Sequence, residues 1–235
     1  MYSTLCTICM RAGSRGLKNK NLKLINGKPL MYFTIKQAIK AKIFDHIVVS
    51  TDSKKILKIA KSYGADGWFL RPKKLALNTS SKVPAIKHAL FQAEKFYNKK
   101  FEIIIDLDVT SPLRKTSDIL KAYKFFIKQK ANILFSGCKS KKNPYFNMIE
   151  IVNNKAQIAK KLKKNIYRRQ DAPKTYDFNA SIYIWKRKSL INFKSFFIDK
   201  TVFYEMPESR SIDIDSELDF KLVEFLLKKK NYMKI

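Results

Sequence analysis

The sequence predicts an α/β fold in which a mostly parallel sheet is covered by helices on both faces. Short apolar, β-branched runs alternate along the chain with amphipathic stretches of helical period, which is the pattern of strand–helix–strand units. Hydrophobic residues make up 46% of the chain, enough for a sizeable core. The length of 235 residues suits one large α/β domain or two small ones, and the chain shows no internal repeat.

Strands are predicted where a short run of apolar and β-branched residues lies between turn-forming segments. These runs are Ser3–Met10, His46–Thr51, Trp68–Leu70, Phe101–Leu107, Asn132–Gly137, Asn179–Trp185 and Thr201–Met206.

Helices are predicted between these runs, and two of them carry clear start signals. Pro29 suits the first turn of a helix that runs to about Lys42, and Ser53 can cap a helix that ends at Gly64. The remaining helices are expected at Pro84–Tyr97, Ser117–Lys128 and Ser216–Lys230.

One long segment departs from this alternation. Residues 139–178 are polar, rich in Lys and irregular in pattern. We therefore predict a single domain over residues 1–235, with an insertion at about 139–178 that projects from the main sheet.

The formal net charge of +30 raises the question of a nucleic-acid partner. The lysines are scattered along nearly every segment, and the sequence has no interleaved platform of Lys and aromatic residues. We therefore expect a solvated basic surface and no nucleic-acid partner, and we keep a nucleic-acid-binding protein as the alternative of a different class.

The arginines are more informative than the lysines. Only eight of the 49 basic residues are Arg, and six of these fall in the segments singled out below. Where Lys is the default cation, Arg is expected to persist at places that need a rigid bidentate fork for a phosphate, a carboxylate or a base edge.

Cysteine usage and the N-terminus point to a cytoplasmic protein. Three cysteines in a chain of this length do not indicate a disulfide framework, and Cys6 and Cys9 of the C-x-x-C match should face opposite sides of a buried strand. We see no signal peptide and no apolar run near the roughly 18 residues of a membrane helix.

A basic loop, Arg11–Leu22, follows the first predicted strand. Loops at the carboxyl ends of parallel strands form the binding crevice in this architecture, and glycines let a backbone approach phosphates. The loop matches neither the P-loop nor the dinucleotide fingerprint. On charge alone, a phosphate-binding loop and an ordinary basic loop are equally well supported.

This loop resembles the signature loop of the CMP-sialic acid synthetases, or acylneuraminate cytidylyltransferases, and of the related CMP-Kdo-type enzymes. The family pattern R-x-G-S-[KR]-G followed by K-N-L is met here by Arg11, Gly13, Ser14, Arg15, Gly16, Lys20, Asn21 and Leu22. The chain departs from it at Ala12, where the family has a second Gly, and at Cys9–Met10, where it has Pro-Ala. The resemblance implies that the loop holds the triphosphate of CTP and helps to seat the cytosine.

Two further segments extend the resemblance. Leu70-Arg71-Pro72 with Leu75-Ala76 is similar to the family's R-P-x-x-L-A segment, in which the Arg contacts the nucleotide. In the segment that follows it, Ser81 is assigned to the nucleotide as well. Thr110-Ser111-Pro112-Leu113-Arg114 matches the family's strand-end motif, but Asp108-Val109 stands where many Neu5Ac enzymes have Gln-Pro. That variant resembles the legionaminic-acid branch.

The blocks Tyr167–Tyr176 and Asn179–Ile184 resemble the family's R-R-Q-x-x-P-x-x-Y and N-G-A-I-Y-I motifs, with Ala180 in place of Gly. The resemblance implicates them in the sugar pocket. It also implies a homodimer in which the insertion makes contact and reaches towards the partner's active site.

Asp213 and Asp215 alternate with isoleucines near the C-terminus. In an extended segment both carboxylates face one way, and paired hard oxygens suit Mg²⁺. Taken alone, the segment is better explained as the Asp-rich start of the last helix. Following the other motifs in family order, these two residues match the family's metal-binding aspartates, while Asp219 is expected to act on the helix dipole.

The resemblance covers Ile8 to Phe220 and implies a Rossmann-like, three-layer α/β/α nucleotidyltransferase fold. The expected reaction joins CTP to a nine-carbon 2-keto-sugar acid, with release of pyrophosphate, for a bacterial surface glycan or flagellin. Legionaminic acid or a derivative is the expected sugar, with Neu5Ac, pseudaminic acid and Kdo as alternatives. The cofactor is Mg²⁺, with Mn²⁺ as the alternative ion.

Each role is carried over to named positions. The nucleotide-binding set is Arg11, Ala12, Gly13, Ser14, Arg15, Lys20, Asn21, Arg71 and Ser81. The sugar-binding set is Asp108, Thr110, Ser111, Arg114, Arg168, Arg169, Gln170, Tyr176 and Asn179. The catalytic set is Arg11, Lys20, Asp213 and Asp215, and the last two are the metal ligands.

Overall fold

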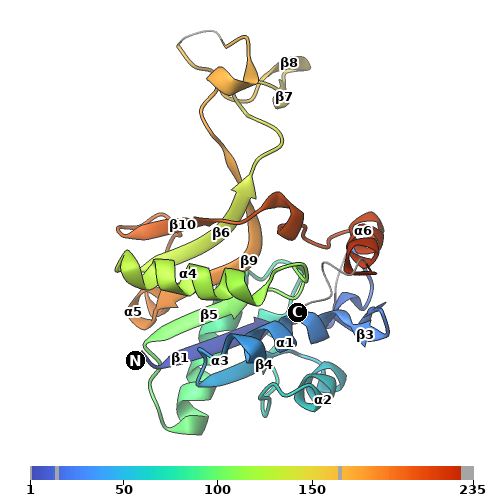
Figure 1. Cartoon of the computed structure of the whole chain (residues 1–235), viewed down its shortest axis with the longest axis vertical. Coiled ribbons are helices and arrows are strands. Elements are labelled where there is room, and N and C mark those ends of the chain that lie inside the picture. The colour runs from blue at the N-terminus through green and yellow to red at the C-terminus, as the bar shows by residue number, and fades with distance from the viewer. Residues whose placement is uncertain (1, 14–15, 164–165, 229–235) are drawn as a thin grey trace.

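The computed structural model of the protein describes residues 2–13, 16–163 and 166–228. A six-stranded sheet forms its centre, with the strand order β10-β6-β9-β5-β1-β4 (Figure 1). The strands are β1 Thr4–Cys9, β4 His46–Ser50, β5 Ile103–Leu107, β6 Ile133–Lys139, β9 Tyr176–Lys186 and β10 Thr201–Glu205.

The sheet is mostly parallel, as the alternating pattern predicts, with one exception. β1 pairs in parallel with β4 and β5, and β10 with β6. β9 runs antiparallel to both of its neighbours, β5 and β6. The chain leaves the sheet at the end of β6 and re-enters it at the same end, so β9 must return in the opposite direction without a crossover.

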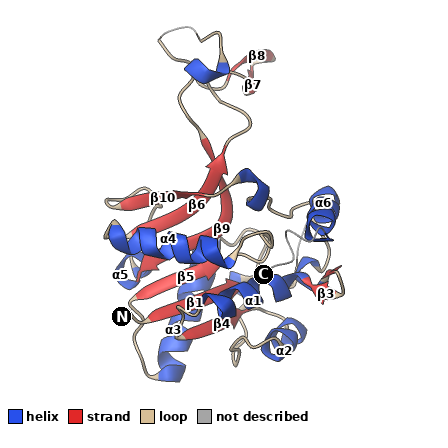
Figure 2. Cartoon of the chain, in the orientation of Figure 1, coloured by secondary structure: helices blue, strands red, loops and turns tan. Residues whose placement is uncertain are grey.

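Helices cover both faces, which confirms the layered architecture (Figure 2). One core cluster unites the helices α1, α2, α4 and α6 with one sheet face, and the other unites α3 and α5 with the opposite face. Cys6 belongs to the first cluster and Cys9 packs against the second, so the two thiols do face opposite sides. The helices are α1 Leu30–Ala41, α2 Lys54–Ser62, α3 Lys82–Tyr97, α4 Thr116–Lys128, α5 Arg187–Ile191 and α6 Glu217–Lys228.

Helix boundaries follow local capping chemistry. The Ser53 hydroxyl accepts a hydrogen bond from the Ile56 amide at 3.3 Å, as expected of an N-cap. At α6, Ser216 and Asp219 exchange side-chain and backbone hydrogen bonds in a reciprocal box. Asp219 is thereby occupied in capping, in agreement with its predicted place at the helix start.

The predicted strand Trp68–Leu70 is wrong. Beyond α2 the chain makes a single bridge to the edge strand β4, between Asp66 and Val48. It then runs past the sheet without a ladder, and Trp68 instead stacks on Phe96 of α3. A short apolar run between turns does not distinguish a strand from a segment that packs against a helix in this way.

The insertion projects beyond the ends of β6 and β9 (Figure 1). It contains the hairpin β7 Ile149–Val152 and β8 Lys155–Ile158, joined through Asn153 and Asn154, both of positive φ. β6 extends to Lys139 and β9 begins at Tyr176, so the sheet includes a few residues that the sequence assigned to the insertion. No helix in the described part of the chain has the length and apolar character of a membrane span.

Candidate active site

A cavity of about 370 Å³ opens at the carboxyl ends of β1 and β5, and we call it the strand-end cavity. Four separate segments line it, which is the expected position for a crevice in a parallel sheet. Its lining is Cys9, Met10, Arg11, Gly16, Lys20, Asn21, Arg71, Leu75, Leu77, Asn78, Ser80, Ser81, Lys82, Asp108, Thr110 and Asp215. The structure thus brings together most of the predicted nucleotide-binding residues.

The loop after β1 is fixed by contacts to its own ends and to the chain's last segment. Asn21 donates to the Arg11 carbonyl at 2.9 Å, which closes the loop. Lys20 donates to the Ile214 carbonyl at 2.5 Å and lies 3.2 Å from Asp215. A Cβ at Gly16 would collide with the Asp215 carbonyl, so only glycine permits this approach.

The rest of the loop is accounted for as follows. The Ala12 amide donates to Asp52 at 2.8 Å, and Gly13 is exposed. Ser14 and Arg15, both assigned to the nucleotide, lie outside the described residues.

On the opposite wall, Arg71 is buried and forked onto the end of β4. Its guanidinium donates to the Ser50 hydroxyl at 3.1 Å and to the Ser50 carbonyl at 2.6 Å. Arg11 reaches across to the Leu77 carbonyl at 3.0 Å. Ser81 lines the cavity at the N-cap position of α3.

The floor of the cavity holds two residues that the sequence did not assign, Lys82 and Asp106, together with the predicted Asp108. The Lys82 ammonium lies 2.6 Å from Asp106 and 2.6 Å from Asp108, and this raises the pKa of Lys82 through the two carboxylates despite burial. The other oxygen of Asp108 accepts from the Thr110 amide at 3.1 Å and hydroxyl at 3.0 Å. Burial alone would raise the pKa of Asp108, but the charge of Lys82 and the hydrogen bonds from Lys82 and Thr110 outweigh it and lower the pKa to about 2.

Asp213 faces this group from the C-terminal segment. The Ile214 amide donates to the Thr110 carbonyl at 3.0 Å, which pins the segment to the loop after β5, and Ile214 is fully buried as predicted. Burial, followed by the charges of Asp108 and Asp215, raises the pKa of Asp213 to about 6. Asp215 differs, because its side chain is 79% exposed at the cavity rim.

Three predicted sugar-binding residues lie behind the cavity. Arg114 is 1% exposed and donates to the Ser181 carbonyl at 2.6 Å and the Thr34 hydroxyl at 3.0 Å. Ser111 donates to the Asn179 carbonyl, and Asn179 is itself bonded to Ser136 and Ser211. These side chains brace the strand ends, and a direct contact to a sugar stays a prediction.

The chain as a whole matches one family model. The model is described as "Cytidylyltransferase" and covers residues 5–233. The chain belongs to the cytidylyltransferase family. This cytidylyltransferase is accordingly a nucleotidyltransferase, as the resemblance of its motifs implies.

Its relatives match over nearly the whole length. A CMP-N,N'-diacetyllegionaminic acid synthase of Campylobacter jejuni is 46% identical over 231 residues, covering 98% of this chain and 97% of the relative. The post-translational flagellin modification protein B of Campylobacter coli is 45% identical with the same coverage. An N-acylneuraminate cytidylyltransferase of Escherichia coli is 33% identical, over 98% of this chain and 54% of that protein.

The fold is also found in solved structures. The structure of CMP:2-keto-3-deoxy-manno-octonic acid synthetase complexed with CTP superposes with a TM-score of 0.67 at 14% identity, covering 96% of this chain and 98% of that one. A 4-diphosphocytidyl-2C-methyl-D-erythritol synthase of Anaerococcus prevotii gives a TM-score of 0.64 at 14% identity, covering 97% and 99%. The predicted Rossmann-like nucleotidyltransferase fold is confirmed.

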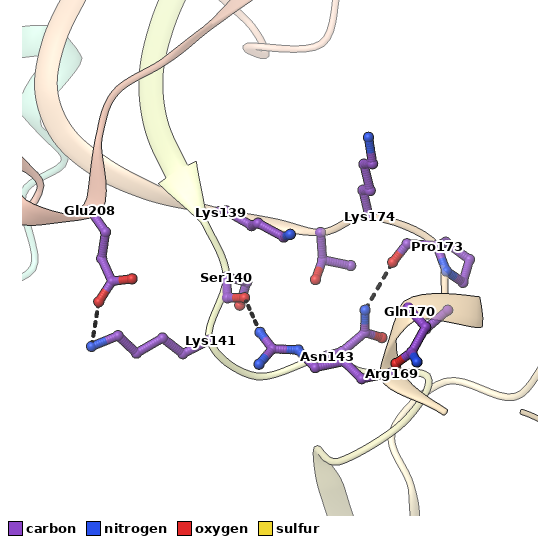
Figure 3. Close-up of a pocket in the computed structure, with 11 residues that line it drawn as sticks. Lys139, Ser140, Lys141, Asn143, Arg169, Gln170, Pro173, Lys174 and Glu208 are labelled. Atoms are coloured by element: carbon purple, nitrogen blue, oxygen red, sulfur yellow. Dashed lines mark hydrogen bonds and ion pairs between the residues drawn. The ribbon is translucent and has the colours of Figure 1, made fainter. Parts of the chain in front are cut away.

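The remaining sugar-binding assignments of this cytidylyltransferase fall on the insertion and away from the strand-end cavity. Arg169 and Gln170 line a different cavity of about 520 Å³ at the base of the insertion, which we call the insertion cavity (Figure 3). Arg169 donates to the Ser140 carbonyl at 2.8 Å. Arg168 forms an ion pair with Asp171 at 2.9 Å, and Tyr176 is 40% exposed at the start of β9.

The residues around Asp213 fit a divalent cation. One oxygen of Asp213 is enclosed and has no hydrogen-bond partner within the described residues, while Asp108 and Asp215 raise the pKa of Asp213 electrostatically. Among residues 2–13, 16–163 and 166–228, no three His, Cys, Asp or Glu side chains form a metal cluster by themselves. Mg²⁺ is commonly held by one or two carboxylates together with waters and substrate phosphates, so the donor set suits it.

Proposed function

We propose that this cytidylyltransferase joins CTP to a nonulosonic acid, releasing pyrophosphate and forming the CMP-sugar. One observation carries the proposal: a cavity at the strand ends is walled by Arg11, Lys20 and Arg71 and faces the acidic group of Asp108 and Asp213. Cations on one side suit a triphosphate, and carboxylates on the other suit a metal and a polyol.

The nucleotide occupies the half of the cavity formed by the loop after β1. Arg11 and Lys20 hold the β- and γ-phosphates and stabilise the charge that develops on departing pyrophosphate. The Arg71 and Ser81 side chains bound the space for the cytidine. Ala12, Gly13, Ser14, Arg15 and Asn21 complete this half on the strength of the family motif.

The acidic half handles the reacting centre. Asp213 and Asp215 would hold Mg²⁺, or Mn²⁺ in its place, and the ion would supply Lewis-acid polarisation of the α-phosphate. The anomeric hydroxyl of the sugar attacks the α-phosphorus in line as the bond to pyrophosphate breaks. His46 stacks on Tyr97 and His88 packs against Phe69. In place of a histidine base, a carboxylate of the acidic group would take the hydroxyl proton, or the hydroxyl would be activated by the ion when bound.

The sugar is N,N'-diacetyllegionaminic acid or a close derivative. The name of the 46% identical relative supports this choice, as does Asp108-Val109 at the strand end. Flagellin is the favoured destination because a 45% identical relative is a flagellin modification protein. The insertion residues Arg168, Arg169, Gln170 and Tyr176 contact the sugar bound by a second copy of the chain, in a homodimer.

Pyrophosphate release with CTP and Mg²⁺ tests the proposal. The panel is N,N'-diacetyllegionaminic acid, Neu5Ac, pseudaminic acid and Kdo, with UTP in place of CTP as the matched control. We expect release with CTP that is at least about tenfold faster for the legionaminic acid than for any other sugar. Equal rates with Neu5Ac would discard the sugar assignment, and silence across the panel from folded protein would overturn the function.

A further inference from the structure

The buried group at the floor of the strand-end cavity contains two residues, Lys82 and Asp106, to which the proposed function gives no role. Lys82, Asp106 and Asp108 form this group, and their side chains are 29%, 0% and 16% exposed. Asp106 and Asp108 are two residues apart along β5 and its end, so both carboxylates point to the same face. One oxygen of each carboxylate lies 2.6 Å from the Lys82 nitrogen, which sits between the two.

That arrangement has the form of a divalent-cation site. Two aligned carboxylates at a strand end, next to a space for phosphates, are the ligands that two-metal phosphoryl-transfer enzymes provide. Here an ammonium takes the central position and neutralises one of the two charges. Without it, two carboxylates would be buried side by side at a high cost in free energy.

The placement of Lys82 is specific to this role. It lies in the first turn of α3, where the helix dipole disfavours a cation, so its carboxylate partners must account for its position. Its ammonium also lies 5.7 Å from the ring centre of Tyr183 on β9, which bounds it from the sheet side. The second oxygens of the two aspartates are occupied as well, that of Asp106 by the Thr7 hydroxyl at 2.7 Å and that of Asp108 by Thr110.

We infer that the Lys82 ammonium stands in place of a second divalent ion between Asp106 and Asp108, so that the active site takes one metal ion per protomer. This inference rests on the proposed function. Lys82 acts as a positioning residue that fixes Asp108 beside Asp213. Its ammonium donates a hydrogen bond to Asp108, forms an ion pair with Asp106 and lines the cavity.

Counting bound Mn²⁺ tests this inference directly. Electron paramagnetic resonance of the full chain saturated with CTP, without sugar, should give one Mn²⁺ per protomer. Lys82→Met removes the charge but keeps an unbranched stem, and it should raise the count to two. The double variant Lys82→Met/Asp106→Asn should return the count to one, and Lys82→Arg, which keeps the charge, should leave it at one.

Lys95→Met is the matched control, because it removes the same charge from an exposed position of the same helix, and its count should be one. A count of two for the unmodified chain, or of one for folded Lys82→Met, would overturn the inference. The count for the unmodified chain needs no variant, so the test stands even where Lys82→Met does not fold. Two Mn²⁺ together with CTP-dependent pyrophosphate release would overturn this inference alone. No Mn²⁺ uptake and no release with any sugar would overturn the proposed function with it.

Discussion

The strand-end cavity and the insertion cavity differ in the contacts that hold their walls together. The strand-end cavity is cross-braced by contacts such as Lys20 to Asp215, which are 195 residues apart in sequence. The insertion cavity is held by contacts of shorter sequence separation, Arg169 to Ser140 and Asn143 to Pro173, and by the ion pair of Lys141 with Glu208 (Figure 3). The walls of the strand-end cavity are therefore fixed by segments from both ends of the chain. The insertion cavity depends mainly on the two segments that connect the insertion to the sheet.

The exposed surface of the insertion strengthens this contrast. Three of its large apolar or aromatic side chains are exposed, although such side chains are usually buried. They are Ile149, Ile151 and Tyr167, at 61%, 64% and 82%. Such a surface fits the proposed second copy of the chain. We therefore predict that the strand-end cavity determines turnover and nucleotide binding, and that the insertion determines the affinity for the sugar.

The largest expected effect lies in the strand-end cavity. Asp213→Asn should lower kcat by about 10³-fold, because polarisation by the metal contributes several kcal/mol. The matched variant Asp215→Asn should lower kcat by only about tenfold, because its carboxylate is mostly exposed and paired with Lys20. Steady-state pyrophosphate release measures both. Equal losses would show that burial does not distinguish the two carboxylates.

A change in the insertion should act on the sugar alone. Arg169→Ala removes a charged donor worth about 1.5–3 kcal/mol, so the KM for the sugar acid should rise by about 10- to 100-fold while the KM for CTP stays constant. Lys155→Ala, a charge removed from the exposed hairpin strand β8, is the control and should change neither constant. A rise in the KM for CTP would contradict the prediction that the insertion acts on sugar binding alone.

The acidity of Asp213 gives the strand-end cavity a pH dependence. Its pKa of about 6 means that a metal must displace a proton at lower pH. Mn²⁺ binding without nucleotide should therefore weaken about tenfold from about pH 7.5 to about pH 5, whereas Asp108, with its pKa of about 2, stays ionised throughout. Isothermal titration at both pH values measures this. The Asp213→Asn variant should lose the dependence, and a flat profile for the unmodified chain would contradict the assignment.

The smallest effect is expected at the junction of the two regions. Ala180 in β9 has a φ of 49°, a left-handed conformation that favours glycine, and the β6–β9 register shifts beside it. Ala180→Gly should raise the free energy of unfolding by about 0.5 kcal/mol, as relief of strain exceeds the entropy gained by the unfolded chain. Ala122→Gly inside α4 should lower it by at least about 1 kcal/mol, because loss of a buried methyl adds to the helix-propensity cost. Urea denaturation compares them, and destabilisation by Ala180→Gly would contradict the strain.

Much of the fold follows from the sequence because hydrophobic period and capping residues act locally. Ser53 and the Ser216–Asp219 box mark helix starts that the structure confirms. The antiparallel direction of β9 could not be predicted from local sequence, because it depends on where the insertion returns the chain to the sheet. The predicted strand at Trp68–Leu70 would likewise have needed a neighbouring strand to pair with. In the described residues, the bridge from this part of the chain to β4 is at Asp66.

The scarce arginines carried more information in this sequence than the common lysines. Arg187 and Arg210, outside the motif segments, fork onto the buried carboxylates of Glu94 and Asp118, as expected of a chain that keeps Arg for rigid pairing. Lys82 was missed because one lysine among so many carries no signal. The alternation of Asp106 and Asp108 at a strand end was the available clue that a cation must lie between them.

Direct competition between sugars tests the central claim most sharply. Limiting CTP is given to the full chain with Mg²⁺ and equal concentrations of N,N'-diacetyllegionaminic acid, Neu5Ac, pseudaminic acid and Kdo, and the CMP-sugars are quantified by mass spectrometry. The product ratio reports relative kcat/KM. We predict that CMP-N,N'-diacetyllegionaminic acid exceeds every other product by at least about tenfold. Dominance of another CMP-sugar, or CTP left unconsumed, would contradict the account.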